Sequence, residues 1–233
     1  MGKKQYDARE IAGNILFITL ILSIVYAIVK IIYAPNTIDT LDSHARLKSD
    51  YVLMLIQCIM GVIVMMLPTI IERKWSLTLP NYMSIIFFVF LFCAIYLGEV
   101  RNFYYLIPHW DTILHAFSAA MLAALGFSLV SVLNDIKKIQ LKLSPIFIAL
   151  FAFCFALAVG ALWEIYEYFF DGLLSLNMQK AFTADGTPLI GRAALADTMK
   201  DLIADAISAF AISALGFFTI KKDRLSNKFK QDH

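Results

Sequence analysis

Six long apolar stretches follow one another along the chain, separated by polar connections. They cover approximately Ile11 to Tyr33, Tyr51 to Ile71, Tyr82 to Gly98, Asp111 to Leu133, Pro145 to Phe170 and Thr198 to Ile220. A helix rises about 1.5 Å per residue, so about 20 apolar residues cross the ~30 Å hydrocarbon core of a bilayer. The third stretch is the shortest. The pattern predicts an all-α polytopic membrane protein, a bundle of six transmembrane helices.

Composition supports one membrane-embedded unit. Of 233 residues, 60% are hydrophobic and 16% charged, and the mean hydropathy is +0.72, too apolar for an ordinary soluble domain. We expect a single integral membrane domain over residues 1–233, in which helices one to three (about 11–98) are scaffold and helices four to six (about 111–220) carry the site. The net charge of +2 is small and gives no support for a nucleic-acid partner.

Basic residues orient the helices, because cytoplasmic loops are enriched in Lys and Arg. The two tails and the second and fourth connections hold Lys3, Lys4, Arg9, Arg73, Lys74, Lys137, Lys138, Lys142, Lys221, Lys222, Arg224, Lys228 and Lys230. The other connections hold Arg46, Lys48, Arg101, Lys180 and Arg192. Both termini are therefore predicted to be cytoplasmic, with residues 221–233 as a basic tail.

Three further features affect the organisation. The first apolar stretch is too long for a signal-peptide core and is read as a retained helix. The connection from Asn36 to Asp50 could hold a short surface helix. The longest connection, from about Gly172 to Ala196, contains turn formers such as Asp185-Gly186 and is either a lid over the outer ends of the helices or a flexible loop.

The cysteines are predicted to be packing residues. Cys58, Cys93 and Cys154 lie singly inside apolar stretches, without the close spacing of a zinc site or a disulfide framework. A free cysteine behaves as a small hydrophobic residue.

Ionisable residues form a stripe at one end of each of the last three helices. The stripes comprise Asp111 and His115; Glu164, Glu167 and Asp171; and Asp197, Asp201 and Asp205. Spacings of three, four, seven and eight residues place each stripe on one helix face. Alternating helix directions bring all three stripes to the outer side. We therefore expect one outward-facing cluster, accompanied by Glu99, Arg101, His109 and Lys200.

The chemistry of the cluster leaves three alternatives. Charged groups in hydrocarbon usually pair, line water or bind ions. Carboxylates with an imidazole suit Mg²⁺, Mn²⁺, Ca²⁺ or Zn²⁺, and the metal ligands would come from Glu164, Glu167, Asp197, Asp201 and Asp205. A proton or Na⁺ relay is the second alternative. The third is structural, with the acids capping helix ends and pairing with Arg101, Arg192 and Lys200.

Small residues accompany the stripes and favour close helix packing in lipid. They recur about every four residues: Ala116, Ala120 and Ala124; Ala156, Gly160 and Ala161; and Ala204, Ser208, Ala209 and Ser213. The last three helices are thus expected to form one tight bundle with inward-pointing carboxylates.

Three motifs carry a resemblance to known proteins: W-D-T-I-L-H at Trp110–His115, W-E-I-Y-E-Y-F-F-D at Trp163–Asp171 and D-T-M-K-D-L-I-A-D at Asp197–Asp205. Through them the chain resembles the YjdF-like family of bacterial inner-membrane proteins over roughly its C-terminal 140 residues. It is more distantly similar to VanZ-like proteins, which are linked to glycopeptide resistance. The resemblance implies a bacterial plasma membrane and a shared polar site at Asp111, His115, Glu164, Glu167, Asp197, Asp201 and Asp205. Ala119 and Ser208 depart from the family, which often has glycine at these positions.

A likeness to CDP-alcohol phosphotransferases is rejected. Their motif needs Ala-Arg soon after Asp-Gly, whereas Arg192 comes seven residues after Asp185. Their chemistry is also cytoplasmic, and this cluster is predicted to face outward.

The leading hypothesis is a cell-envelope protein whose outer-leaflet site binds a cation and acts on a lipid-linked or amphiphilic substrate. In that reading, His115 is the general base, oriented by Asp111. The alternatives are a small proton- or Na⁺-coupled transporter and a non-catalytic accessory protein that influences envelope-drug resistance. Membrane lipids are the expected surroundings, and both a monomer and a homo-oligomer are compatible with the sequence.

Overall fold

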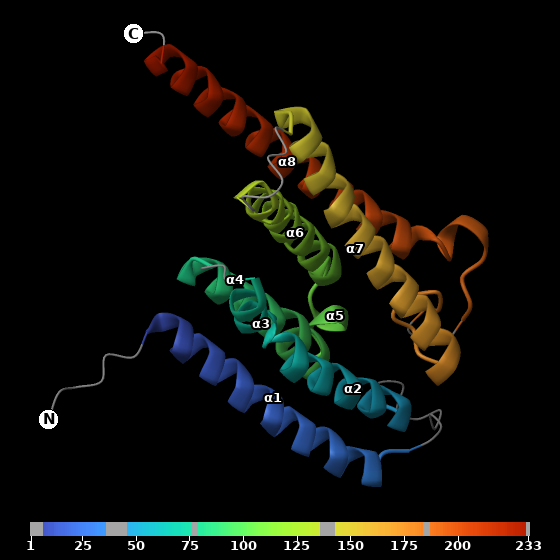
Figure 1. Ribbon diagram of the computed structural model, residues 1–233. Helices are drawn as coiled ribbons and strands as arrows, with labels where there is room; N and C mark the ends of the chain where they lie inside the picture. Colours follow the sequence, from blue (N-terminus) through green and yellow to red (C-terminus); the bar gives the residue numbers. More distant parts are fainter. Residues whose placement is uncertain (1–6, 36–45, 76–78, 136–142, 184–186, 232–233) are drawn as a thin grey trace, which may run out of the picture. The chain divides into compact units, whose positions relative to one another are not determined.

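The computed structural model describes residues 7–35, 46–75, 79–135, 143–183 and 187–231, and within these the fold is all-α (Figure 1). The elements are α1 (Ala8–Tyr33), α2 (Lys48–Val64), α3 (Leu67–Trp75), α4 (Asn81–Leu91), the π-helix η1 (Phe92–Val100), α5 (Phe103–Leu106), α6 (Trp110–Asp135), α7 (Pro145–Leu174), the 3₁₀-helix η2 (Gly191–Ala193) and α8 (Ala196–Gln231).

The prediction of six membrane-length helical segments is confirmed. They cover Ala8–Tyr33, Lys48–Lys74, Asn81–Val100, Trp110–Val130, Pro145–Leu174 and Ala196–Arg224. The last helix is longer than predicted, because α8 continues to Gln231 through the basic segment after Ile220. Most of the connection predicted at Asn36–Asp50 and the Asp185-Gly186 turn lie outside the described residues.

Local sequence signals set several helix boundaries. The side chain of Asp7 accepts a hydrogen bond from the backbone N–H of Arg9 at the start of α1. The hydroxyl of Ser144 accepts one from the N–H of Phe147 at the start of α7, and Pro145 follows it with a backbone angle suited to the first helical position.

Two irregularities were not predicted. The second apolar stretch is interrupted between α2 and α3, because Pro68 has no N–H to donate to the carbonyl of Val64. In the third stretch, α4 passes into the nine-residue π-helix η1, a rare form for which the sequence gives no periodic signal.

The chain divides into two compact units. The first contains residues 1–110, 170–177 and 182–187, and the second contains residues 111–169, 178–181 and 188–233. In the first unit, α1 packs against α2, α4 and η1. Its core contains Leu16 and Leu20 of α1, Met54 and Cys58 of α2, and Phe88 of α4.

All three cysteines are free. Cys58 is buried in this core, in agreement with its predicted packing role, whereas Cys154 is exposed on α7.

The second unit is built on a face of small residues. The buried positions on α7 run from Ile148 through Ala152, Ala156 and Gly160 to Glu164 and Glu167. On α8 the buried positions are Asp201, Asp205, Ala209 and Ser213, each four residues apart. Small residues and acids therefore share one continuous face on each helix.

Close approach in this unit depends on small residues on all three helices. A Cβ at Gly126 of α6 would lie 2.8 Å from the Cα of Ala152 on α7. The buried alanines of α6 are Ala119 and Ala123, whereas Ala124 is exposed. The buried face of α6 therefore passes through Ala119 and Ala123, one position before the predicted Ala120 and Ala124.

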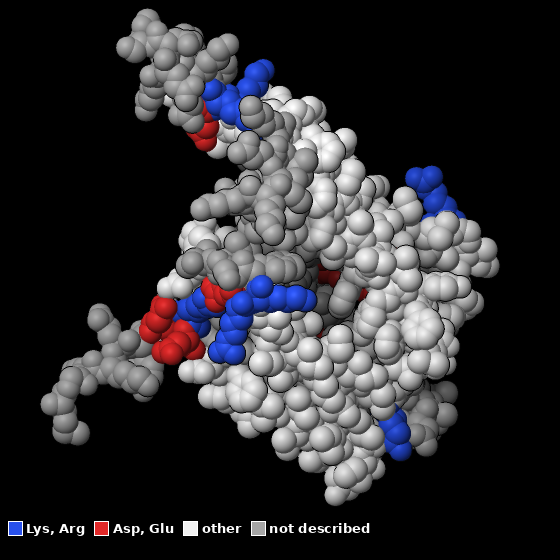
Figure 2. Space-filling view, viewed as in Figure 1, with Lys and Arg blue, Asp and Glu red and all other residues white. Residues whose placement is uncertain are grey.

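The opposite helix faces are apolar and exposed. On α8, Ile207 is 65% and Phe210 66% exposed. In Figure 2 most of the coloured or white surface atoms belong to residues that are neither acidic nor basic. Such faces suit contact with lipid tails.

Candidate metal centre

Three helices of the second unit bring six carboxylates and one imidazole together. Asp111 and His115 lie in the first turns of α6, Glu164 and Glu167 near the end of α7, and Asp197, Asp201 and Asp205 in the first turns of α8. Exposure is 0% for Asp205, 2% for Asp201, 5% for both glutamates, 6% for His115 and 9% for Asp111. Burial of this degree requires ionised groups to be paired or bound to an ion.

The two ring nitrogens of His115 face different carboxylates. Nδ1 lies 3.3 Å from each carboxylate oxygen of Asp205. Nε2 lies 3.5 Å from Oε1 of Glu164 and 4.0 Å from Oδ1 of Asp111. With Nδ1–H directed at Asp205, the lone pair of Nε2 points toward the other acids, which is the usual arrangement of a metal-binding histidine.

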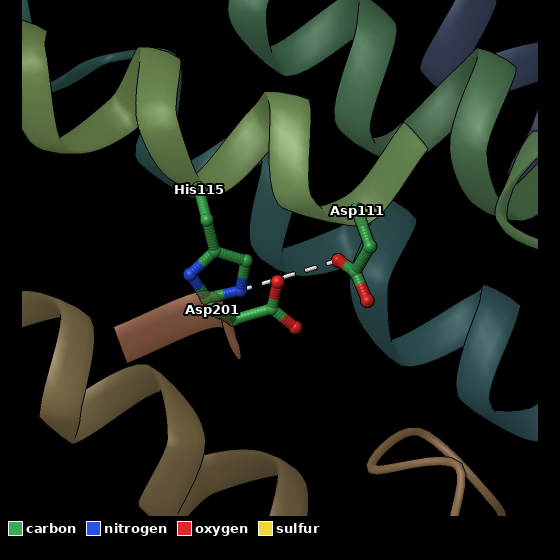
Figure 3. A group of neighbouring side chains, drawn as sticks. All are labelled: Asp111, His115 and Asp201. Atoms are coloured by element: carbon green, nitrogen blue, oxygen red, sulfur yellow. Dashed lines mark ion pairs between the residues drawn. The ribbon is translucent and has the colours of Figure 1, made fainter. Parts of the chain in front are cut away.

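Asp111, His115 and Asp201 form a compact set of ligand atoms. One carboxylate oxygen from each aspartate and a ring nitrogen of His115 all lie within 4.8 Å of one another. Figure 3 shows the imidazole and the carboxylate of Asp201 facing each other, with Asp111 one helical turn before His115. One ion bound through contacts of about 2.0–2.2 Å would draw these three atoms slightly closer together.

Several buried oxygens of the cluster lack a hydrogen-bond partner. Neither carboxylate oxygen of Glu164 accepts a hydrogen bond in the described part of the chain, nor does Oδ1 of Asp201. The hydroxyl groups of Thr198 and Thr112 interact with these two acids but do not reach hydrogen-bond geometry at those oxygens. Unpaired buried acceptors are unfavourable, so the arrangement is suited to receive a cation.

Lys180 lies at the exposed edge of the cluster. Its Nζ is 2.8 Å from Oδ2 of Asp111 and 3.0 Å from both carboxylate oxygens of Asp197. Burial alone would lower the pKa of the Lys180 ammonium, but the charges of Asp111 and Asp197 outweigh burial and raise the pKa above its usual value. Lys180 therefore stays protonated and neutralises part of the charge of Asp111 and Asp197. Among the described residues, the deeper acids have no lysine or arginine partner.

Glu167 has a different environment from Glu164. Its Oε1 accepts a hydrogen bond of 3.0 Å from the indole Nε1–H of Trp163 on the same helix. Trp163 therefore supplies a hydrogen-bond donor to Glu167 from the same helix. Both oxygens of Glu164 lack such a donor and are available to another partner.

Gly160 provides the space for Asp205. A Cβ at position 160 would overlap the carboxylate of Asp205, which lies directly against α7. Asp205 is thereby fixed between the backbone of α7 and the imidazole of His115.

The structure brings together most of the residues selected from sequence. The carboxylates of Asp111, Glu164, Asp201 and Asp205 all lie close to the imidazole of His115. Asp197 is held at the edge by Lys180, and Glu167 is hydrogen-bonded to Trp163. Asp205, rather than Asp111, is the carboxylate nearest to Nδ1 of His115. Glu99, Arg101, His109 and Asp171 belong to the first unit.

Two residues of the arrangement, Lys180 and Gly160, were not predicted as part of the site. Lys180 was used only as a charge that orients the helices, although its place in the loop before the Asp197 stripe was a signal for an ion pair. Gly160 was assigned to helix packing alone, whereas it also makes room for Asp205.

A comparison with protein families decides the classification. Residues 14–222 match the family described as "Predicted membrane protein (DUF2238)". The chain belongs to the DUF2238 family. The match covers all six membrane-length segments in whole or in large part, so a multi-pass membrane protein is supported by both the family and the fold. No curated protein and no solved structure matches the chain significantly.

Proposed function

We propose that this DUF2238 protein binds one divalent metal ion through Asp111, His115 and Asp201 and hydrolyses an amphiphilic substrate at the membrane surface. The observation that carries the proposal is the convergence of three buried ligands within 4.8 Å beside Glu164, whose buried oxygens have no hydrogen-bond partner. A bound dication would neutralise acids that Lys180 does not contact.

The ligand set favours particular metals. One imidazole with carboxylates is a mixed nitrogen and oxygen set, typical of Zn²⁺ or Mn²⁺, whereas Ca²⁺ and Mg²⁺ prefer oxygen alone. Among the metals considered from sequence, Mn²⁺ and Zn²⁺ therefore fit best.

The geometry supports separate roles for the acids. Asp205 orients His115 through Nδ1, so that Nε2 is available as a ligand. Glu164 lies 3.5 Å from Nε2 and has its oxygens available, which makes it the best-placed general base. This assignment gives His115 a ligand role instead of the general-base role inferred from sequence.

The proposed reaction adds water across an ester bond. A metal ion held by Asp111, His115 and Asp201 would supply Lewis acidity and activate a water molecule. Glu164 accepts the proton released when the water oxygen bonds to the electrophilic centre. The bond to the leaving oxygen breaks, and the same proton can then pass from Glu164 to that oxygen, so that atoms and charge balance.

The surroundings of the cluster support an amphiphilic substrate. Ile190 and Leu195, in the segment that leads into α8, are 86% and 63% exposed, and Met199 in the first turn of α8 is 49% exposed. Exposed apolar groups close to an acidic site suit a molecule with a tail and a polar head. The motif resemblance to YjdF-like and VanZ-like proteins, together with the distribution of Lys and Arg, supports a bacterial inner membrane with the site facing outward.

A transport role is less well supported. The buried face of the second unit beyond the cluster contains Ala119, Ala123, Ala156 and Ala209 and, among the described residues, no buried ionisable group. A relay through the membrane would need further polar groups along this face.

Metal binding tests the proposal directly. Purified full-length protein in lipid nanodiscs is treated with chelator, dialysed separately against Mn²⁺ and Zn²⁺, and analysed for metal content by mass spectrometry. We expect about one ion per chain for at least one of the metals, and a loss of affinity of about tenfold or more in Asp201→Asn, because a ligand charge is removed.

Asp223→Asn is a matched control, since Asp223 is an exposed acid on the same helix α8, about 33 Å along the helix axis from Asp201. Its metal content should equal that of the wild type. Wild-type protein that retains neither metal, or Asp201→Asn protein that retains as much as the wild type, would contradict the proposal.

A further inference from the structure

Lys180 lies between the buried acids and the solvent. Its side chain is 34% exposed, compared with 12% for Asp111 and 20% for Asp197. An ammonium group has three N–H donors. The Nζ is 2.8 Å from Oδ2 of Asp111 and 3.0 Å from both oxygens of Asp197. Since the two Asp197 oxygens are equidistant, one N–H directed between them serves both, and the third N–H is then open to a ligand that approaches from the exposed side of the lysine.

The backbone at Lys180 is held in a conformation that is uncommon for a lysine. Its φ is +50°, in the left-handed region that favours glycine. Contacts on both sides stabilise it: Nε2 of Gln179 donates to Oγ1 of Thr198 at 2.9 Å, and the N–H of Leu189 donates to the carbonyl of Ala181 at 2.9 Å. Strain of this kind persists where the surrounding structure fixes a side chain in a particular place.

Asp111 links Lys180 to the proposed metal position. Oδ2 of Asp111 contacts the ammonium group, while Oδ1 lies on the side of Nε2 of His115. A metal held by Asp111, His115 and Asp201 would therefore be separated from the Lys180 ammonium by a single carboxylate. Two adjacent cationic centres are suited to an anion with several oxygens, such as a phosphate group.

The residues around this edge fit an anion that carries a hydrocarbon tail. Lys200 is exposed on α8, and its charge acts on Asp197. Ile190 and Leu195 are also exposed in the segment before α8. Without a metal the carboxylates would repel an anion, whereas a bound dication would reverse the local charge.

We propose that Lys180 is a specificity-determining residue that binds a phosphate monoester head group of the substrate beside the metal. This inference rests on the proposed function, because it requires the metal. It narrows the substrate class to amphiphiles with a terminal phosphate. A free phosphate ion would bind through the same kind of oxygens. The experiment distinguishes binding of a lipid head group from binding of free phosphate.

The experiment uses full-length protein loaded with Mn²⁺ in phosphatidylcholine nanodiscs. Enhanced ³¹P relaxation, caused by the paramagnetic ion, reports phosphate bound close to the metal. The probes are dihexanoyl phosphatidic acid, inorganic phosphate and dihexanoyl phosphatidylcholine. We expect saturable enhancement with phosphatidic acid, and an affinity lower by about tenfold or more in Lys180→Met, because a charge-assisted hydrogen bond is lost.

Four comparisons interpret the result. Lys180→Arg should restore much of the affinity, and Lys222→Met, an exposed lysine further along α8, should leave it unchanged. Lys180→Met should unfold cooperatively and bind about one Mn²⁺ ion per chain, which would show that the variant is folded and loaded. Its unfolding midpoint should be lower than that of the wild type, because Asp111 and Asp197 lose their cationic partner. Tighter binding of phosphatidic acid than of inorganic phosphate would support a lipid head group, whereas equal binding would support Lys180 as a site for free phosphate.

Distinct outcomes overturn the two proposals. If the wild type binds no Mn²⁺ or Zn²⁺, the proposed function fails and this inference fails with it. If Mn²⁺ binds but Lys180→Met retains wild-type affinity for phosphatidic acid, only the role of Lys180 is overturned. Equal binding of phosphatidylcholine and phosphatidic acid would also overturn it.

Discussion

Replacing His115 with leucine should lower the free energy of unfolding of the metal-free protein by about 3–5 kcal/mol, the usual effect of removing one partner from a buried charged pair. The imidazole is the partner that the structure gives Asp205, a residue with 0% exposure. It also lies 3.5 Å from Glu164, whose oxygens have no hydrogen-bond partner in the described chain. Reversible unfolding by SDS in mixed micelles would measure the change.

A double-mutant cycle separates this interaction from a general packing effect. Adding Asp205→Leu to His115→Leu removes the carboxylate left unpaired and should recover part of the lost stability, because apolar replacement of a whole buried pair is often tolerated. Ser213→Ala lies on the same face of α8 and removes a hydroxyl without a partner, so it should be neutral or slightly stabilising. Additive effects of His115→Leu and Asp205→Leu would contradict the predicted coupling.

Gly160→Ala should destabilise the protein by about 1–3 kcal/mol, the range found when extra atoms are forced into a packed interior. The added methyl group would overlap the carboxylate of Asp205, so that α8 or the side chain has to move away from His115. Both stability and metal affinity should fall together. Thermal unfolding and metal titration of the same preparation would measure the two changes.

Gly172→Ala on the same helix is the matched control. No atom lies within 4 Å of a Cβ built at Gly172, and alanine favours the helix by up to about 1 kcal/mol relative to glycine. The two identical substitutions should therefore change stability in opposite directions. Equal effects at both positions would show that Gly160 does not form a specific space for Asp205.

Much of the fold could be predicted because membrane helices have a strong sequence signal. Long apolar runs with polar connections located all six segments. The break before Pro68 and the π-helix η1 were missed because the hydrophobic pattern continues through both. The extension of α8 to Gln231 was missed because its last turns are polar and lie beyond the apolar stretch.

The site could be predicted only as a set of residues. Spacing of three or four residues correctly placed the acids on one face of α7 and of α8, where Glu164, Glu167, Asp201 and Asp205 are buried. It could not show which carboxylate faces which nitrogen of His115, because that depends on the rotation and separation of neighbouring helices. The pairing of Lys180 with Asp111 joins residues 69 positions apart and depends on the path of a loop.

The acidic face of α8 also has a consequence for how the chain enters the membrane during synthesis. An aspartate disfavours insertion of an isolated helix by about 2.5–3.5 kcal/mol at the helix centre and by less toward the ends. Asp201 and Asp205 are both buried in the first turns of α8, so each adds a smaller penalty and the two act together. We expect α8 to be integrated inefficiently alone and more efficiently after α6 and α7, which supply His115 and the space at Gly160. A glycosylation reporter fused after α8 would measure integration in both contexts, and equal efficiency would contradict assisted entry. The last helix would thus depend for its entry on helices made before it.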